Sequence, residues 1–310
     1  MSEILVFGGV NLDQVVYLPR APKEGETLEG KSVQTFLGGK GANQAVALSR
    51  LGASVSFVGN VGQDSFGKEL TLELSNEGLD LSMLGVAQEK TGTAFINVFK
   101  NSDNQIIYVP GANQFTNHKQ VPKESLEEAK IVVSQMEVNS EEVEQLFVNS
   151  KENNCLTILN VAPFRKPSDL LISNTDILVF NELEFRLFVG IETSERLEMD
   201  DLKRKLDAIS ISIKSSLIIT LGERGLVYFE DKDMNYIKGH EVEAIDTVGS
   251  GDCFVGALSF SLLKGKSLKE SCEFANKSAA ISVTRKGAAA SMPTIDEVEN
   301  LKGAISTLDN

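Results

Sequence analysis

The sequence predicts an α/β protein with a mostly parallel sheet covered by helices on both faces. Short apolar runs typical of buried strands alternate with segments that have helical apolar spacing, and several of these runs end at glycine or at a polar residue. Such alternation favours parallel strands, because each crossover helix packs back onto the sheet. With 310 residues, of which 42% are hydrophobic, the chain can form one large domain with an insertion, or two domains.

The first elements are identified from apolar spacing and from the residues that end them. Ile4–Phe7 is followed by two glycines and is typical of a buried strand. Gly41–Leu51 has apolar residues at helical spacing and is stopped by Gly52. The next elements are a strand at Val55–Val58, a helix at Phe66–Asn76, a strand at Ile131–Ser134 and an acidic helix at Glu141–Asn153.

The second half of the chain continues the alternation. We expect strands at Thr157–Leu159, Ile177–Phe180 and Leu217–Leu221, and a helix at Leu202–Ile213. The polar triplet Asp231-Lys232-Asp233 separates the runs Val227–Glu230 and Asn235–Ile237, which predicts a β-hairpin. Three helices close the chain, at Phe254–Lys264, Leu268–Arg285 and Ile295–Leu301.

Two segments break this alternation. Gln14–Phe36 and Thr93–Pro110 contain strand-like runs without helices, and the second has a polar turn at Asn101–Asn104. We expect them to form a small sheet apart from the main layer, in the position of a lid beside an active cleft. The predicted division is a main domain of residues 1–13, 37–92 and 111–310 and a β lid of residues 14–36 and 93–110.

Composition excludes several classes of partner. The chain has 44 Asp and Glu against 30 Lys and Arg, a net charge of −14, which disfavours nucleic acid and anionic membranes but not a small phosphate ligand in a local site. Three widely spaced cysteines, Cys155, Cys253 and Cys272, form no disulfide or metal pattern and indicate a cytoplasmic protein. No signal segment is recognisable, and no apolar run reaches the ~20 residues that span a bilayer.

The most informative motif is Asp246–Asp252, in which two carboxylates bracket a Gly-Ser-Gly turn before an apolar helix. Such a turn exposes backbone N–H groups at a helix N-terminus, which form an anion site. A carboxylate there would repel a phosphate, unless it takes the proton of a hydroxyl that attacks phosphorus. The alternative is that Asp252 only caps the helix.

Two further motifs lie near the N-terminus. Asp13, in Asn11-Leu12-Asp13, follows the first strand and could accept hydrogen bonds from the vicinal hydroxyls of a sugar, or form an Asx-turn. Gly38–Asn43 opens a helix, where Lys40 supplies a cation and Asn43 a donor and an acceptor. Its glycine spacing matches neither a dinucleotide fingerprint nor a P-loop.

Polar residues also end the later strands. Asn160 and Asn181 follow two strands, and Glu182 could hold a hydrated Mg²⁺, although strand-end turns and helix starts use the same residues. Thr220–Gly225 could carry a nucleotide across its glycines or form only a tight turn. Glu137 follows another strand and is a substrate contact or a surface carboxylate.

Together these segments resemble the ribokinase family of carbohydrate kinases over essentially the whole chain. The motifs that carry the resemblance are Asn11-Leu12-Asp13, Gly38–Asn43, Asn181-Glu182, Thr220–Gly225, Asp246–Asp252 and Thr284–Ala288. The resemblance implies a three-layer α/β/α domain with a sheet of roughly nine strands and a small β lid. It also implies phosphorylation of D-ribose at O5 by ATP, with Mg²⁺ and K⁺ as cofactors.

The same resemblance assigns roles to individual residues. Asp252 would be the general base, and the amides of the segment from Gly249, Ser250 and Gly251 to Asp252 would form the anion hole. The sugar would contact Asn11, Asp13, Gly39, Lys40, Asn43, Glu137 and Asp252, and the nucleotide Asn181, Thr220, Gly222, Gly225, Gly251 and Asn276. Mg²⁺ would be organised through water by Glu182, and a monovalent cation by Asp246, Val248, Ser282, Arg285, Gly287 and Ser291.

The resemblance implies a homodimer formed through the lid, and it leaves alternatives. A kinase for another sugar or a nucleoside would have the same motifs. A catalytically silent binding protein on this scaffold is disfavoured by Asp252 and its glycines. A nicotinamide-dependent oxidoreductase would need a glycine fingerprint that the sequence lacks.

Overall fold

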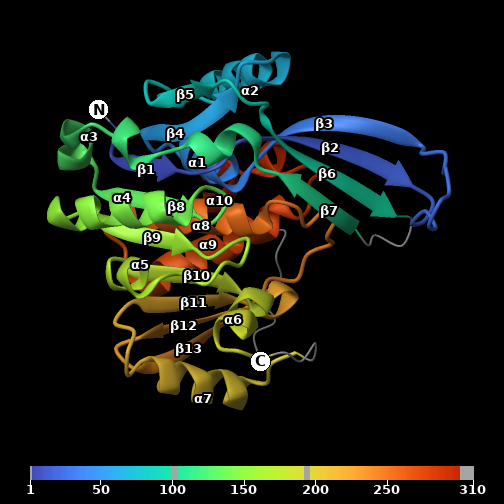
Figure 1. The fold of residues 1–310 in the computed structure, drawn as a ribbon. Helices are drawn as coiled ribbons and strands as arrows, with labels where there is room; N and C mark the ends of the chain where they lie inside the picture. The colour runs from blue at the N-terminus through green and yellow to red at the C-terminus, as the bar shows by residue number, and fades with distance from the viewer. Residues whose placement is uncertain (1, 100–103, 192–195, 301–310) are drawn as a thin grey trace.

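The computed structural model describes residues 2–99, 104–191 and 196–300, and Figure 1 shows their arrangement. A nine-stranded sheet forms the centre, in the order β13-β12-β11-β10-β9-β8-β1-β4-β5. Its strands β1, β4, β5 and β8–β11 pair in parallel, and only β12 and β13 are antiparallel. The bounds are Ile4–Phe7 for β1, Val55–Gly62 for β4, Leu84–Ala87 for β5, Ile131–Gln135 for β8, Leu156–Asn160 for β9, Ile177–Asn181 for β10, Ser216–Thr220 for β11, Gly225–Glu230 for β12 and Asp233–Lys238 for β13.

Helices cover both faces of this sheet, as the alternation predicted. Alternate residues of β1 show the two faces, because Ile4 and Val6 belong to one buried cluster and Leu5 and Phe7 to the other. The first face is covered by α1 (Lys40–Arg50), α2 (Ser65–Asn76), α8 (Ser250–Leu263), α9 (Leu268–Ser282) and α10 (Ile295–Glu299). The second is covered by α3 (Lys123–Glu128), α4 (Ser140–Glu152), α5 (Asp169–Ser173), α6 (Glu182–Phe188) and α7 (Met199–Ile209).

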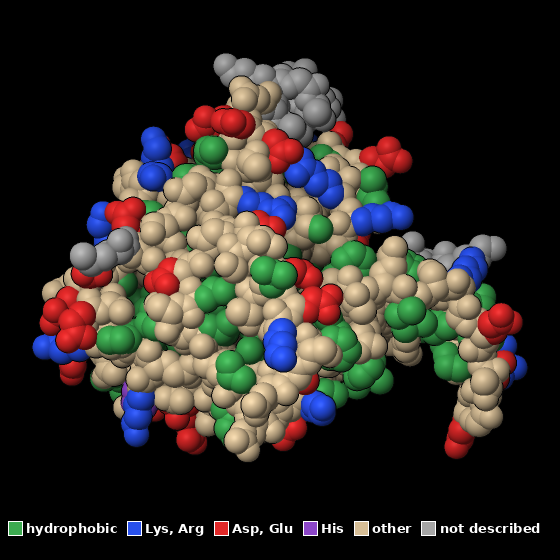
Figure 2. All heavy atoms as spheres, turned by 90° about the horizontal axis from the view of Figure 1, so that it is seen from above, with side chains coloured by type: hydrophobic (Ala, Val, Ile, Leu, Met, Phe, Trp, Pro, Cys, Tyr) green, Lys and Arg blue, Asp and Glu red, His purple; other side chains and the backbone are tan. Residues whose placement is uncertain are grey.

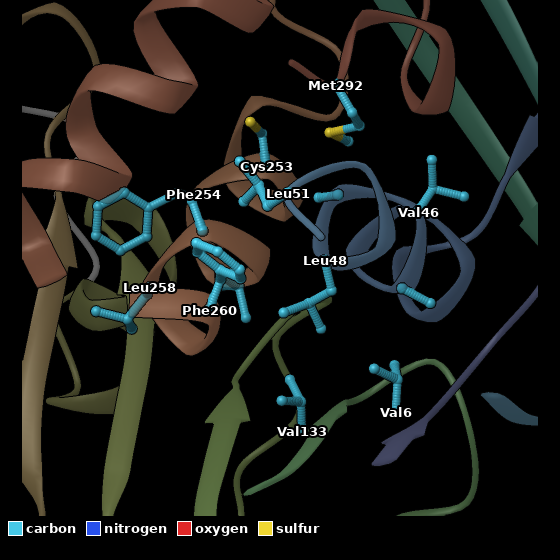
Figure 3. Close-up of a cluster of buried hydrophobic side chains, with 14 of the residues drawn as sticks. Val6, Val46, Leu48, Leu51, Val133, Cys253, Phe254, Leu258, Phe260 and Met292 are labelled. Carbon is cyan, nitrogen blue, oxygen red and sulfur yellow. The ribbon is translucent and has the colours of Figure 1, made fainter. Parts of the chain in front are cut away.

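The first face contains the packing that matters most for the site. Figure 3 shows side chains of α1, including Val46 and Leu48, against those of α8, including Phe254 and Leu258, with Val6 and Val133 of the sheet beneath them. All six side chains are at most 3% exposed. Burial of this apolar area fixes the two helices relative to each other.

A second sheet of four strands projects from the main body (Figure 1). Its order is β3-β2-β6-β7, from Ser32–Gly38, Asn11–Leu18, Gly92–Phe99 and Asn104–Val109. The small sheet expected from the two helix-free segments is therefore confirmed. Asn11 and Asp13 lie within its strand β2, so the Asx-turn alternative for Asp13 is wrong. The polar turn expected at 101–104 falls largely outside the described residues.

Several predicted boundaries differ from the structure. The helix expected at Leu202–Ile213 ends at Ile209, and Ile211, which extended the apolar pattern, is 89% exposed. The helix expected from Phe254 starts at Ser250, so that Gly251 and Asp252 are helical. The hairpin at Asp231-Lys232 is confirmed, with both residues at positive φ as a two-residue turn requires.

Further boundaries differ at the ends of strands and helices. Strand β4 continues through two glycines to Gly62, and its partner β5 was not predicted. The helix from Leu268 ends at Ser282, and α10 is described to Glu299. Among the described residues, no helix is both long enough and apolar enough to cross a membrane.

Candidate active site

The site lies where parallel strands end and two helices begin. Helix α1 starts directly beside the end of β1, since the amide of Ala42 donates to the carbonyl oxygen of Gly9 at 3.0 Å. A Cβ on Gly39, whose φ is +91°, would lie 2.7 Å from that same oxygen, and a Cβ on Gly41 would lie 2.7 Å from the carbonyl carbon of Gly8. Glycine is required here because the helix start touches the strand end.

The N-cap of helix α8 is Gly249, which has φ +77° and makes no side-chain hydrogen bond to the helix. Asp252 is the third residue of the helix, so the alternative that it is the N-cap is wrong. Amides in the first turn have no acceptor within the helix, although that of Ser250 reaches the carbonyl oxygen of Thr247 at 3.3 Å. A Cβ on Gly251 would have no atom within 4 Å, so this residue faces open space.

The Asp252 carboxylate is held by two side chains of α1. Asn43 Nδ2 donates to Oδ2 at 2.9 Å, and Gln44 Nε2 donates to Oδ1 at 3.0 Å. Asp252 is 5% exposed. The start of α8 is thus joined to the start of α1, and a carboxylate stands between them.

The residues predicted to contact sugar gather beside Asp252. The Oδ1 atom of Asn11 accepts a hydrogen bond from Asn113 Nδ2 at 2.7 Å, and the amide of Lys40 donates to Glu137 Oε2 at 2.8 Å. The buried Oδ1 atom of Asn43 has no hydrogen-bond partner, which leaves an acceptor for a ligand. Asp13 completes the group, and its carboxylate lies where a Cβ on Gly38 would clash.

The electrostatics of this group are those of a site built for a polar ligand. Burial raises the pKa of Asp13 to about 7, helped by the charges of Glu137 and Asp252. Burial likewise raises the pKa of Glu137 to about 7, against the opposing effect of Lys40. Burial disfavours the Lys40 ammonium, but the carboxylates around it outweigh this and raise its pKa.

The raised pKa of Asp13 predicts how stability depends on pH. Its carboxyl is protonated more readily in the folded protein, so the stability it contributes is complete below pH 4 and is lost as pH rises towards 7. Asp13→Asn removes this loss. We expect its Tm to exceed that of the wild type by more at pH 8 than at pH 5, measured by thermal unfolding without ligands. An equal difference at both pH values would contradict the buried ionisation, and Asp207→Asn on the exposed face of α7 is the control.

A cavity of about 900 Å³ extends from this group along the ends of β9–β11. Its lining includes the following predicted residues: Lys40, Asn181, Glu182, Thr220, Gly222, Gly225, Gly249, Ser250, Gly251, Asp252 and Asn276. The sugar-contact residues Asn11, Asp13, Gly39, Asn43 and Glu137 do not line it. They adjoin it through Lys40 and Asp252, which belong to both groups.

The nucleotide residues are fixed by their local structure. Asn181 is the N-cap of α6 and forms a capping box with Glu184. This agrees with the alternative that Asn181 has a structural role at the strand end and helix start. Gly222 and Gly225 both have positive φ in the turn from β11 to β12. Asn276 Nδ2 donates to the carbonyl oxygen of Lys238 at 2.9 Å.

The two carboxylates that follow Asn181 have different protein partners. Glu182 Oε2 accepts from Arg224 NH2 at 2.8 Å, and its Oε1 accepts from the amide of Leu197 at 2.6 Å, so protein groups already engage both oxygens. Glu184 is 8% exposed and lines the cavity, and burial, together with the charge of Asp252, raises its pKa. Glu182 and Glu184 both line the cavity, and Glu184 also has a protein partner, since its Oε2 accepts from the amide of Asn181 at 2.8 Å.

Two of the predicted monovalent-cation residues, Val248 and Gly287, contact Asp246. Its Oδ1 accepts from the amide of Val248 at 3.0 Å and its Oδ2 from that of Gly287 at 2.9 Å, which joins two loops. The Arg285 guanidinium pairs with Glu297, so its charge is neutralised away from Asp246. Ser282 and Ser291 are buried beside these loops, and the oxygen-rich set fits a hard monovalent cation.

Sequence reasoning missed several residues that hold the site. Gln44, Asn113 and Glu184 were not singled out. A signal existed for Glu184, because Asn181 followed three residues later by Glu is a capping-box pattern. No sequence pattern identified Asn113, which is fully buried and contacts Asn11 across 102 positions of the chain.

Comparison with known proteins agrees with this geometry. Residues 1–295 match the pfkB family of carbohydrate kinases. The chain belongs to this family. It is 39% identical over 297 residues to the ribokinase of Haemophilus influenzae, covering 95% of this chain and 96% of that protein. The fold prediction and the prediction of a phosphotransferase are thereby confirmed.

Solved structures of pfkB-type kinases superpose on the whole fold. The ribokinase of Giardia lamblia has a TM-score of 0.89 at 30% identity, covering 97% of this chain and 99% of that one. The ribokinase of Arabidopsis thaliana, solved with ribose and ATP, has a TM-score of 0.87 at 30% identity, covering 97% and 98%.

Proposed function

We propose that this carbohydrate kinase transfers the γ-phosphoryl group of ATP to O5 of D-ribose, producing ADP and D-ribose 5-phosphate. One observation carries the proposal: the buried Asp252 carboxylate stands where the 900 Å³ cavity meets the group of Asn11, Asp13 and Asn43. That position suits a base between a bound sugar and a bound nucleotide. The Arabidopsis relative, solved with ribose and ATP, supports both ligands.

In the proposed reaction, Asp252 takes the proton of the 5-hydroxyl of ribose while the oxygen of that hydroxyl attacks the γ-phosphorus. The bond from the γ-phosphorus to the bridging oxygen breaks, and its electron pair leaves with ADP. The amides at the start of α8, with Gly251 opening onto the cavity, and the Lys40 ammonium offset the negative charge of the transferring group. Asn11, Asp13, Asn43 and Glu137 would bind the sugar hydroxyls.

Two cations belong to the proposal. Glu182 would organise Mg²⁺ through water, and the ion would neutralise phosphate charge. K⁺ would bind oxygen atoms of Asp246, Val248, Ser282, Arg285, Gly287 and Ser291, as the resemblance assigns. Because a Cβ on Gly249 would lie 2.8 Å from Ala288, this loop packs directly against the start of α8 and a bound ion would order both.

We further propose that residues 14–36 and 93–110 act as a lid and form a homodimer contact. Cross-strand register places Val33, Phe95, Ile107 and Val109 on one face of the small sheet, and they are 40–63% exposed. Figure 2 shows apolar side chains along this projecting arm. A contiguous apolar face of this kind is typical of an interface.

The dimer is tested by light scattering after size exclusion. Ile107→Asp is expected to give monomer, whereas Ile211→Asp, at a more exposed residue outside the small sheet, leaves the mass unchanged. A wild-type monomer at high protein concentration would overturn the dimer.

A cytoplasmic location fits ATP as substrate and three free cysteines, all buried.

The substrate assignment is tested with a panel of ribose, deoxyribose, fructose, ketodeoxygluconate and adenosine, with and without K⁺. Ribose is expected to give the highest kcat/KM. If another compound outranks ribose, the substrate is wrong but the kinase reaction stands. Absence of phosphoryl transfer to every acceptor would overturn the role given to Asp252.

A further inference from the structure

Both oxygens of the Asp252 carboxylate are engaged by neighbouring amides of α1, and only one of these amides has a role in the proposed function. Asn43 belongs to the sugar contacts, whereas Gln44 does not line the cavity and is fully buried. Its Nε2 atom lies 3.0 Å from Asp252 Oδ1. A buried polar side chain that reaches the proposed base without facing a ligand requires an explanation.

The Gln44 amide is oriented by residues at the ends of two strands. Its Oε1 accepts a hydrogen bond from Gln135 Nε2 at the end of β8, at 2.6 Å, and its Nε2 also lies 3.2 Å from Asn160 Oδ1 at the end of β9. If the amide were reversed, its oxygen would face the Asp252 carboxylate and its nitrogen would face the Gln135 donor. Because an ionised carboxylate only accepts hydrogen bonds, the contact with Asp252 selects the orientation in which an N–H points at it, and the contact with Gln135 is compatible with that orientation.

We propose that Gln44 is a positioning residue that fixes the direction in which the Asp252 carboxylate points. This inference rests on the proposed function, in which Asp252 is the general base. The bond from Gln44 to Oδ1 and the bond from Asn43 to Oδ2 together prevent rotation of the carboxylate plane. Proton transfer depends steeply on such alignment.

The test is the variant Gln44→Met, of similar length but without donors. We expect kcat for ribose phosphorylation to fall about tenfold, as for loss of one hydrogen bond to a charged group, while the KM for ATP is retained. The KM for ribose should change less than kcat, because Gln44 acts on the orientation of the proposed base. Gln44→Glu should instead lose activity as pH rises, because the two adjacent carboxyls work only while they share a proton.

The matched control is Gln120→Leu, which removes another amide that bonds to backbone carbonyls, of Gly59 at 3.0 Å and Met83 at 3.1 Å, outside the site. It should lower Tm without lowering kcat. If Gln44→Met behaves in the same way, the positioning role is wrong. If Gln44→Met does not fold, the Gln44→Glu profile decides. Asp252→Asn is measured alongside: if it retains turnover, the proposed function fails, and if it is inactive while Gln44→Met equals the wild type, only this inference fails.

Discussion

Replacing Asp252 by Asn is expected to lower kcat for ribose phosphorylation by at least about 10²-fold, the usual contribution of a general base. The amide keeps the shape of the carboxylate but cannot accept the proton of the sugar hydroxyl. Because the cavity residues that would contact the nucleotide are untouched, ATP binding should persist. Steady-state kinetics gives the first quantity, and titration calorimetry with ATP gives the second.

The control for this experiment is Asp207→Asn, which removes an exposed carboxylate paired with Lys203 on α7 and should leave kcat unchanged. A variant of Asp252 with near-normal turnover would show that some other group takes the proton. Loss of ATP binding together with activity would point instead to a damaged start of α8.

Gly251→Ala is expected to lower kcat by about 10²-fold, similar to loss of one donor from an oxyanion hole. The added methyl group would meet no atom beyond its own helix turn within 4 Å, and because Gly251 lines the cavity, it would narrow the space proposed for the transferring phosphoryl group. Its helical position predicts no loss of stability, since Ala is the better helix former by about 1 kcal/mol. Kinetics and thermal unfolding of the same preparation separate the two effects.

Gly256→Ala, further along α8, is expected to have the opposite effect, a loss of stability. Its Cβ would lie 2.6 Å from the Cβ of Ala47 on α1, so it should lower Tm by forcing the two helices apart. Should Gly251→Ala retain full turnover, the amides at the start of α8 would not surround the phosphoryl group.

The sequence was informative wherever a local pattern determined the structure. Apolar runs followed by glycine or asparagine located β1, β9 and β10, and the Asp231-Lys232 turn located a hairpin, because period and turn chemistry are properties of a few adjacent residues. It was misleading where an exposed apolar residue imitated the pattern, as Ile211 did at the end of α7.

The site was predicted to a similar extent. The Gly-Ser-Gly turn indicated where an anion would bind, and the resemblance supplied roles for the residues around it. Arg224, 42 positions after Glu182, donates to that carboxylate, and no local pattern predicts this contact. Gln44 and Asn113 were not identified because partners such as Asp252 and Asn160 for Gln44, and Asn11 for Asn113, are over 100 positions away.

The order of strands and helices, the acidic surface and the glycine-bearing helix starts were set by the chain's own residues, since spacing and backbone freedom are local. Only the tertiary structure determines that α1 and α8, about 200 positions apart, pack together so that Asn43 and Gln44 donate hydrogen bonds to Asp252. Their apolar faces are buried together on one side of the sheet, and this packing places the carboxylate.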